Sequence, residues 1–196
     1  MTTSSAIEWR VRLAEERDIS ALHKLIEASV RGLQADDYTP AQIAGALGTV
    51  LGLDTQLIRD RTYYVVETAL AVESATYSSE SRLACGGWSK RKTLFGSDHA
   101  SVREPELLDP AVDAAKVRAI FVHPRYARRG LGSLILAHVE AAAQATGFTH
   151  FEMGSTLTGV PLYRLKGYVE QERVLVPLHN GEALPIIRMT KEAGPR

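Results

Sequence analysis

A glycine-containing segment in the second half of the chain combines residue types that bind phosphate groups. The run Arg129-Gly130-Leu131-Gly132-Ser133 falls where a strand-like stretch gives way to a helix-like one. Glycines let backbone N–H groups approach a phosphate closely, and the first turn of a helix presents its unpaired amides there. Short glycine patterns also occur in ordinary solvated turns. The segment therefore indicates an anion site, and its surroundings must decide between the two interpretations.

The basic residues of the chain gather around this segment. Between Ala114 and Val139 the sequence holds no acidic residue and five basic ones. These are Lys116, Arg118, Arg125, Arg128 and Arg129. Arginine just before a helix N-terminus is unfavourable because that end already carries partial positive charge, so a bound anion is the expected compensation. No Gly-Lys-Ser/Thr is present and position 135 is Ile, so neither a Walker loop nor a dinucleotide-binding Gly-x-Gly-x-x-Gly is favoured.

The composition of the 196 residues restricts the class of protein. Hydrophobic residues make up 45% and charged residues 23%, which is ordinary globular usage. We expect a single domain over residues 1–196, with a core from about residue 8 to about residue 191. Lys plus Arg and Asp plus Glu both number 23, so the formal net charge is zero. A zero balance argues against a general binder of nucleic acid or of membrane surfaces, although a local anion site remains compatible with it.

Cysteine and histidine usage indicates neither disulfides nor a metal. Cys85 is the one cysteine, in a Leu-Ala-Cys-Gly context that is typical of a small buried residue rather than a nucleophile. The six histidines show no metal-ligand spacing, so no metal site is expected. The first residues lack the pattern of a signal peptide, and no run approaches the roughly 20 apolar residues of a membrane span. A soluble protein of a reducing compartment, the cytoplasm by default, is the expectation.

Hydrophobic periodicity predicts the elements that must position these residues. The predicted strands are Glu8–Leu13, Thr62–Glu67, Leu83–Ser89, Ala115–Val122, Phe148–Met153, Tyr168–Pro177 and Leu184–Thr190. The predicted helices are Glu15–Arg31, a segment starting at Pro40 behind a Thr39 cap, Leu131–Ala145 and Gly159–Leu165. Ala71–Ser81 is a polar connection, and Lys90–Asp113 is a long insertion without clear periodicity. This mixture favours an α/β (α+β) fold, in which a mixed sheet carries helices on its faces.

The face of the predicted helix Leu131–Ala145 can also be assigned from its spacing. Six residues recur on one side of the helix, and we expect them to pack on the sheet. They are Leu131, Leu134, Ile135, His138, Val139 and Ala142. The closing strands are joined through Asn180-Gly181, a dipeptide that favours a hairpin turn.

The run from Ala115 to Glu140 resembles the acyl-CoA-binding motif of the GNAT N-acetyltransferase superfamily. That motif is a strand, a short loop with a pair such as His-Pro, and Arg/Gln-x-x-Gly-x-Gly/Ala at the start of a helix. The match consists of His123-Pro124, Arg129, Gly130, Gly132 and an apolar helix. The Arg/Gln position is Ala127 here. In the family this position contributes mainly its backbone, so Ala should be tolerated there, and Arg128 could partly replace the lost side chain.

A second segment of the chain extends the resemblance. Tyr163, Gly167 and Tyr168 match the family's Tyr-x-x-x-Gly-Phe/Tyr segment, whereas the Asn that often precedes it is Thr156 here. The two motifs together imply the GNAT fold over most of the chain, from the first strand to Thr190. That fold is a mixed, mostly antiparallel twisted sheet of about seven strands flanked by about four helices. The implied activity is direct transfer of an acetyl group from acetyl-CoA to a primary amine.

The resemblance also implies roles for individual residues. The pyrophosphate of acetyl-CoA would be held by backbone amides and arginines of the glycine segment, and the pantetheine arm by the edge of the preceding strand. The implied cofactor residues are Ile120, Phe121, Val122, Arg128, Arg129, Gly130, Leu131, Gly132, Ser133 and Thr156. A backbone N–H of the strand would also stabilise the negative charge that develops on the thioester oxygen. Tyr163 resembles the family's general acid, which protonates the leaving thiolate, although a tyrosine on a short helix can simply pack there.

The group that deprotonates the acceptor amine stays open. Lys116 and Arg118 occupy the strand where some relatives place a glutamate. The remaining candidates for a base are Asp98, His99, Glu152, Asp36 and Asp37, any of which can equally be a solvated surface residue.

Recognition of the acceptor is expected from three places around the thioester. They are the connection Ser29–Thr39, Trp88, which could also be a core residue, and the insertion Lys90–Asp113. The acidic bias of the insertion could attract a cationic amine or merely solvate a loop. Alternatives to a small-molecule acetyltransferase are a non-catalytic acyl-CoA-binding module and a protein or peptide acetyltransferase. A homodimer is a further implication of the resemblance.

Overall fold

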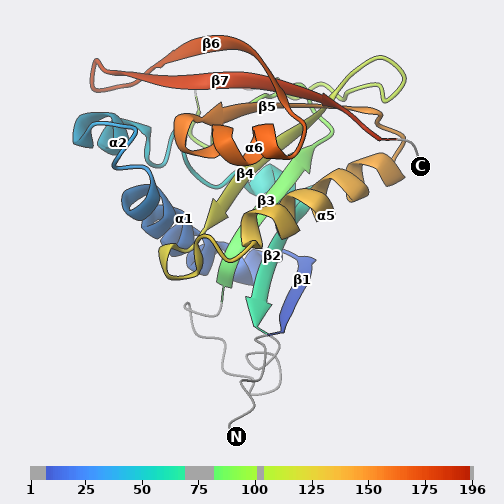
Figure 1. Ribbon diagram of the computed structural model, residues 1–196, viewed down its shortest axis with the longest axis horizontal. Helices are drawn as coiled ribbons and strands as arrows, with labels where there is room; N and C mark the ends of the chain where they lie inside the picture. Colours follow the sequence, from blue (N-terminus) through green and yellow to red (C-terminus); the bar gives the residue numbers. More distant parts are fainter. Residues whose placement is uncertain (1–7, 69–81, 101–103, 195–196) are drawn as a thin grey trace, which may run out of the picture.

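The computed structural model describes residues 8–68, 82–100 and 104–194. Its seven strands form one sheet in the order β1-β2-β3-β4-β5-β7-β6, shown in Figure 1. The strands are β1 (Trp9–Leu13), β2 (Tyr63–Thr68), β3 (Arg82–Ser89), β4 (Ala115–Val122), β5 (His150–Thr156), β6 (Val169–Pro177) and β7 (Ala183–Glu192). All seven predicted strands are confirmed. The predicted polar connection Ala71–Ser81 lies outside the described residues.

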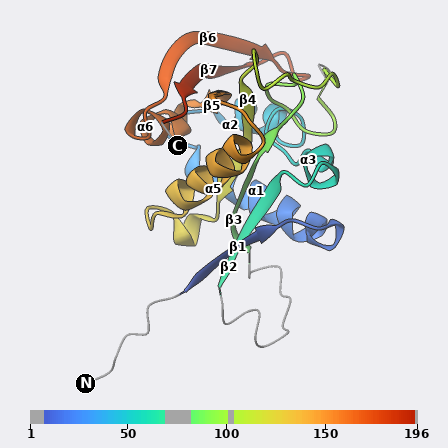
Figure 2. The ribbon, with the colours of Figure 1, turned by 90° about the vertical axis from the view of Figure 1, so that its right-hand side faces the viewer.

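Helices cover both faces of the sheet. They are α1 (Ile19–Leu33), α2 (Pro40–Ala46), α3 (Thr55–Arg59), α5 (Leu131–Ala145) and α6 (Val160–Leu165), with short 3-10 turns at Glu16–Asp18, Pro124–Tyr126 and Leu157–Gly159. Figure 2 shows α5 on one side of the sheet and α1 and α3 on the other. None of the described helices is long and apolar enough to cross a membrane. The helix α3 was not predicted from the sequence.

The strands β4 and β5 run parallel but stay together only at one end. Their pairing consists of Ala115 with Phe151 and Lys116 with Glu152, and no further pair joins the two strands as described. Beyond that point β4 continues beside β3, whereas β5 continues beside β7. The sheet therefore opens between β4 and β5, and one edge of each strand is left without a strand partner.

A bulge in β4 lies at the start of this opening. Arg118 is opposite Gly87 and Phe121 is opposite Cys85, so that two residues of β4 face a single residue of β3. Ala119, one of the two, has a φ of 52°, in the left-handed region that is rare for residues other than glycine. The bulge turns the backbone of β4 at the point where the strand parts from β5.

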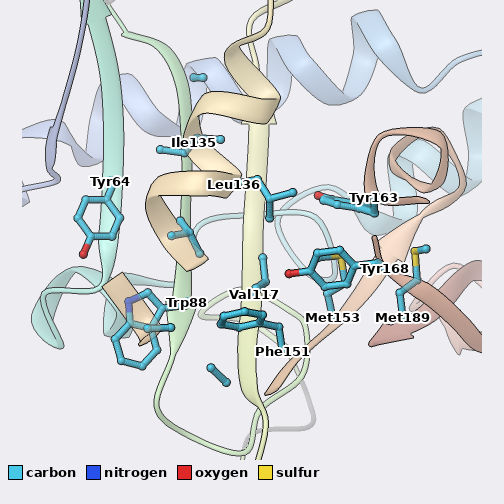
Figure 3. Packing of buried hydrophobic residues seen from close by; sticks show 14 of the residues in the cluster. Tyr64, Trp88, Val117, Ile135, Leu136, Phe151, Met153, Tyr163, Tyr168 and Met189 are labelled. Atoms are coloured by element: carbon cyan, nitrogen blue, oxygen red, sulfur yellow. The ribbon is translucent and has the colours of Figure 1, made fainter. Parts of the chain in front are cut away.

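Two apolar clusters separated by the sheet form the core. One lies between the sheet and α5 and α6 (Figure 3), and the other lies between the sheet and α1, α2 and α3. In α5 the buried residues are Leu131, Ile135, Leu136, Val139 and Ala143. Leu134 and Ala142 are partly buried and pack against this cluster, as predicted, whereas Leu136 and Ala143 were not predicted. His138 lies at the rim, with its ring 4.5 Å from that of Tyr64.

Candidate functional site

A small cavity of about 70 Å³ lies where β4 and β5 separate. Its walls come from both strands, from α6, from the end of α1 and from two connecting segments, residues 50–52 and 94–96. The strand residues include Ala119 and Ile120 of the bulge, together with Gly154 and Thr156 of β5. The opening of the sheet and the cavity therefore coincide.

The edge of β4 beside the cavity is the predicted binding site of the extended pantetheine arm. Ile120 and Phe121 line the cavity, and Val122 follows them along the strand. Gly86 is needed on the neighbouring strand, because a Cβ there would lie 2.7 Å from Cγ1 of Ile120. The amide of Val122 donates to the hydroxyl of Ser29 on α1 at 3.3 Å. A ligand that accepts a hydrogen bond from the Val122 amide must displace this hydroxyl or share the amide with it. The sequence did not reveal this contact.

The glycine segment forms a turn that presents backbone amides at the start of α5. Arg128 and Gly130 both have positive φ values, of 63° and 87°. The first hydrogen bond of the helix runs from the amide of Leu134 to the carbonyl of Gly130. The amides of Leu131, Gly132 and Ser133 precede this bond, so they are available to an anion, as the sequence predicts.

Charge and packing around this turn favour an anion as well. Arg128 and Arg129 are exposed, and the guanidinium of Arg129 lies 5.6 Å from the ring centre of Tyr126. The 3-10 turn Pro124–Tyr126, which leads into the glycine turn, packs against α1, where Gly32 allows a close approach. A Cβ at Gly32 would lie 2.5 Å from Cγ of Pro124. The 3-10 turn thus packs on α1, while the arginines of the glycine turn face solvent.

Tyr163 reaches the cavity from α6. It is 8% exposed, and its ring packs edge-on against that of Tyr168 at 5.8 Å, beside Met153 in Figure 3. Burial raises the pKa of the Tyr163 hydroxyl above its ordinary value near 10. The hydroxyl therefore keeps its proton at neutral pH and can act as a proton donor. Thr156, the other predicted residue of this region, also lines the cavity.

The carboxylates and imidazole considered as bases do not line the cavity. Glu152 accepts from Lys116 and from Arg188, and these hydrogen bonds lower the pKa of its carboxyl although desolvation alone would raise it. Asp98 accepts from the amide and the hydroxyl of Thr55 at 3.0 and 2.9 Å and so caps α3.

The other candidate bases also lie elsewhere. Asp37 accepts from the hydroxyl of Thr158 at 2.6 Å on the surface. His99 lines a separate hollow beside His23 on α1. Asp36 is exposed in the connection that follows α1. None of these groups is positioned to take a proton inside the cavity.

Trp88 and Cys85 are structural residues. Trp88 is 3% exposed and packs edge-on against Phe148 with ring centres 5.7 Å apart, so the alternative in which it lines a substrate pocket was wrong. Cys85 is fully buried and lies 3.2 Å from the hydroxyl of Tyr63. Burial raises the pKa of its thiol to about 12, which agrees with an unreactive cysteine.

The insertion contributes to the cavity through Leu94, Phe95 and Gly96. Arg118 holds it in place: its guanidinium pairs with Asp54 at 2.7 Å and donates to the carbonyl of Gly96. The hydroxyl of Ser97 donates to the carbonyl of Gly48 at 2.6 Å and ties the insertion to the loop after α2. Within the described residues, no group of three or more His, Cys, Asp or Glu side chains is placed to hold a metal ion.

Sequence reasoning missed several residues of the cavity. Gln34 and Leu94–Gly96 fall in segments that were expected to contact the acceptor, but neither was singled out. Residues 50–52 lay outside those segments, and Arg118 was not expected at the acceptor site. No local signal identifies them, because they meet only through the packing of α1, the insertion and β4.

Comparisons with known proteins agree with this geometry. Residues 106–193 match the family model of the acetyltransferase (GNAT) domain. This stretch contains β4, the glycine turn, α5, β5, α6 and the closing strands β6 and β7. No curated protein sequence matches the chain.

Solved structures share the fold along nearly the whole chain. A GCN5-related N-acetyltransferase from Rhodopseudomonas palustris is 20% identical, with a TM-score of 0.61 over 98% of this chain and 99% of that one. PaiA N-acetyltransferase from Thermoplasma acidophilum, solved in complex with coenzyme A, is 10% identical, with a TM-score of 0.60 over 95% and 99%. Ribosomal-protein-S18-alanine N-acetyltransferase from Escherichia coli is 14% identical, with a TM-score of 0.53 over 96% of each chain.

Residues 106–193 thus match the acetyltransferase (GNAT) domain, and the chain as a whole has the fold of solved N-acetyltransferases. The expected fold is thereby confirmed, and the expected resemblance to the GNAT family is confirmed over residues 106–193.

Proposed function

We propose that this protein transfers the acetyl group of acetyl-CoA directly to the primary amine of a small molecule. One observation carries the proposal: a single cavity is lined by the open edge of β4 and by Tyr163, the implied proton donor. An oxyanion donor, a proton donor and space for an acceptor thus adjoin one another.

The residues present fit a bound acetyl-CoA. The amides of Leu131, Gly132 and Ser133 precede the helix ladder, and space is open above Gly130, where a Cβ would meet nothing within 4 Å. Arg128 and Arg129 supply positive charge beside these amides. The edge of β4 at Ile120 lies between this turn and the cavity. We therefore assign the diphosphate to the turn and the extended arm to the edge of β4.

Acetyl-CoA, when bound, supplies an acetyl thioester whose carbonyl carbon is attacked by the acceptor amine. In the balanced reaction a C–N bond forms, the C–S bond breaks, one proton leaves the amine and one proton is taken up by the thiolate. We assign the backbone amide of Ile120, on the edge of β4 that lines the cavity, as the donor to the thioester oxygen while negative charge develops on it. Tyr163 gives its hydroxyl proton to the sulfur and recovers a proton from solvent.

The size of the cavity favours a small acceptor over a peptide. Its volume is about 70 Å³, and residues 94–96 of the insertion form part of its wall. A peptide would need a groove that accommodates several residues beside the thioester. A non-catalytic acyl-CoA-binding module would not require a proton donor, so Tyr163 at the cavity favours an enzyme over that alternative.

A turnover assay with the full-length protein tests the proposal. Acetyl-CoA is offered with a panel of small primary amines and, in parallel, with peptides that carry a free N-terminus, and release of free thiol is measured. We expect turnover with at least one small amine and none with the peptides. Turnover with peptides alone would assign the chain to protein acetylation. Failure to bind acetyl-CoA in a calorimetric titration would overturn both readings.

A further inference from the structure

Gln34 is a polar residue of the cavity to which the proposed reaction gives no role. It ends α1: its amide donates to the carbonyl of Val30 at 3.2 Å, and its carbonyl accepts the amides of Asp37 and Tyr38, both at 3.1 Å. The backbone of Gln34 is thus fixed by hydrogen bonds to residues before and after it in the chain. The side chain is 6% exposed and lines the cavity together with Tyr163.

The carboxamide of Gln34 contains an unmet hydrogen-bond acceptor. Its Oε1 is buried and has no hydrogen-bond partner among the residues that the structure describes. A buried carbonyl oxygen without a partner costs free energy, and an apolar side chain of similar shape would avoid that cost. Rotation about the last side-chain bond exchanges this oxygen with the NH₂ group, so the carboxamide can present its oxygen to the cavity.

Other buried polar atoms without partners are located elsewhere. In the described part of the chain they are Trp9 Nε1, Trp88 Nε1, Glu140 Oε1 and Tyr168 Oη, and none of these residues lines the cavity. Gln34 is therefore where an unmet acceptor and the cavity coincide. A hydrogen-bond donor on a bound molecule would satisfy this acceptor.

The cavity offers no described side chain that could take a proton from an ammonium ion. Of the lining residues, Arg118 and Tyr163 are the titratable ones. Arg118 is a cation already engaged with Asp54 and with the carbonyl of Gly96, and Tyr163 is a proton donor. A cationic amine would therefore meet a buried guanidinium and no carboxylate on the cavity wall. This arrangement favours an acceptor whose amino group is already neutral.

The rest of the cavity wall combines apolar side chains with polar groups, among them Ser155 and Thr156. Its larger apolar side chains are Val50, Leu51, Leu94, Phe95, Val117 and Met153. The apolar part of this lining desolvates a hydrocarbon group of the acceptor favourably. Together with the small volume, it suits a compact apolar body next to the amino group.

We propose that Gln34 binds the acceptor amine through its carboxamide oxygen, and that the acceptor is a weakly basic primary amine on a compact apolar body, such as a simple aromatic amine. The inference rests on the proposed acetyl transfer. The neutral amine donates one N–H to Oε1 of Gln34, which leaves its lone pair free to attack the acetyl carbon. Once the C–N bond has formed, the proton of the nitrogen passes to solvent water.

The main test replaces Gln34 by leucine, which keeps the approximate shape and removes both polar groups. Aniline is the acceptor probe. We expect kcat/KM for aniline to fall by about 10- to 100-fold, the loss typical of one hydrogen bond to a substrate. The Kd for acetyl-CoA should stay unchanged, and the melting temperature should be unchanged or higher. Gln171→Leu, on the exposed strand β6, is the matched control and should leave all three quantities unchanged.

A second variant gives a readout that a merely structural role would not move. Gln34→Glu keeps an oxygen acceptor and adds a negative charge, which favours a protonated amine. We expect the wild type to prefer aniline over benzylamine at pH 7, and Gln34→Glu to shift the ratio of the two kcat/KM values toward benzylamine by about tenfold.

The outcomes separate the inference from the proposed function. If the wild type acetylates amines and Gln34→Leu is as active as the wild type, the role of Gln34 is overturned while the proposed function stands. A wild-type preference for benzylamine overturns the acceptor class. If acetyl-CoA binds but no amine is acetylated, the proposed function falls and the inference falls with it. Should Gln34→Leu fail to fold, the ratio of the kcat/KM values for aniline and benzylamine, measured in Gln34→Glu and in the wild type, still tests the inference.

Discussion

The ring of Tyr163 occupies the space that a side chain at Gly159 would need. An ideal Cβ on Gly159 would lie 2.7 Å from Cε2 of Tyr163 and 2.9 Å from the hydroxyl of Ser155. The backbone of Gly159 has a φ of −79°, so no left-handed conformation calls for glycine there. The close approach of the tyrosine ring requires it, and the position of Tyr163 at the cavity depends on this approach.

Replacing Gly159 by alanine should therefore displace Tyr163 without touching its chemistry. We expect kcat to fall by about tenfold or more, because a proton donor loses its effect when it is misplaced by even about 1 Å. The Kd for acetyl-CoA should be unchanged. Gly194→Ala is the control, since a Cβ there meets nothing within 4 Å, and it should behave like the wild type. Unchanged turnover in Gly159→Ala would show that the ring position does not matter for catalysis.

Removing the hydroxyl of Tyr163 tests its role directly. Tyr163→Phe should lower kcat by roughly 10²- to 10⁴-fold, the usual contribution of a general acid, and leave the Kd for acetyl-CoA unchanged. Tyr168→Phe is the matched control, because Tyr168 is a buried tyrosine that packs on Tyr163 and does not line the cavity. It should keep full activity. Equal kcat values in the two variants would exclude Tyr163 as the proton donor.

The pH dependence of kcat should follow the protonation of Tyr163. A general acid must carry its proton, so activity is lost as pH rises through its pKa. Because burial raises this pKa above 10, kcat at saturating acceptor should show no alkaline decline below about pH 10. Stopped assays between about pH 6 and pH 10 would measure this. A decline centred near pH 8 would assign the proton donor to another group.

The strands and the caps of this fold could be predicted because their signals are local. Thr39 and Gln42 form the reciprocal hydrogen bonds of a capping box within one turn, and Pro40 follows at the first helical position. Gly181 has a φ of 82° in the predicted hairpin turn. In such places neighbouring residues alone determine the conformation.

The missed parts depend on contacts between distant segments. The five-residue helix α3 is capped partly by Asp98, 43 residues beyond Thr55. The cavity likewise joins Gln34 at the end of α1 to Tyr163 of α6. Residue types could indicate the cofactor turn and the proton donor, but the acceptor wall required the tertiary structure.

Arg118 and Asp54 form a buried ion pair, and removing one partner should lower the stability of the protein strongly. The two side chains are only 2% and 1% exposed. Asp54→Asn retains an oxygen that can cap α3 but leaves Arg118 without its counter-charge, so the free energy of unfolding should fall by about 3–5 kcal/mol in urea titrations. Glu27→Gln removes the exposed pair with Arg31 and should cost no more than about 0.5 kcal/mol. Equal losses in both variants would contradict the prediction.

Gly130 and Gly181 provide a matched pair for testing the cofactor turn. Both have left-handed backbones, with φ values of 87° and 82°, and a Cβ at either would meet nothing within 4 Å. Alanine at either position should therefore cost about 1–2 kcal/mol of stability through backbone strain alone. At Gly130 the added methyl group would also enter the open space beside the amides of α5, where we place the diphosphate. We expect Gly130→Ala to raise the Kd for acetyl-CoA by about tenfold or more in calorimetric titrations, because close backbone approach is lost. Gly181→Ala should bind acetyl-CoA as the wild type does, and an equal Kd in the two variants would place the diphosphate elsewhere.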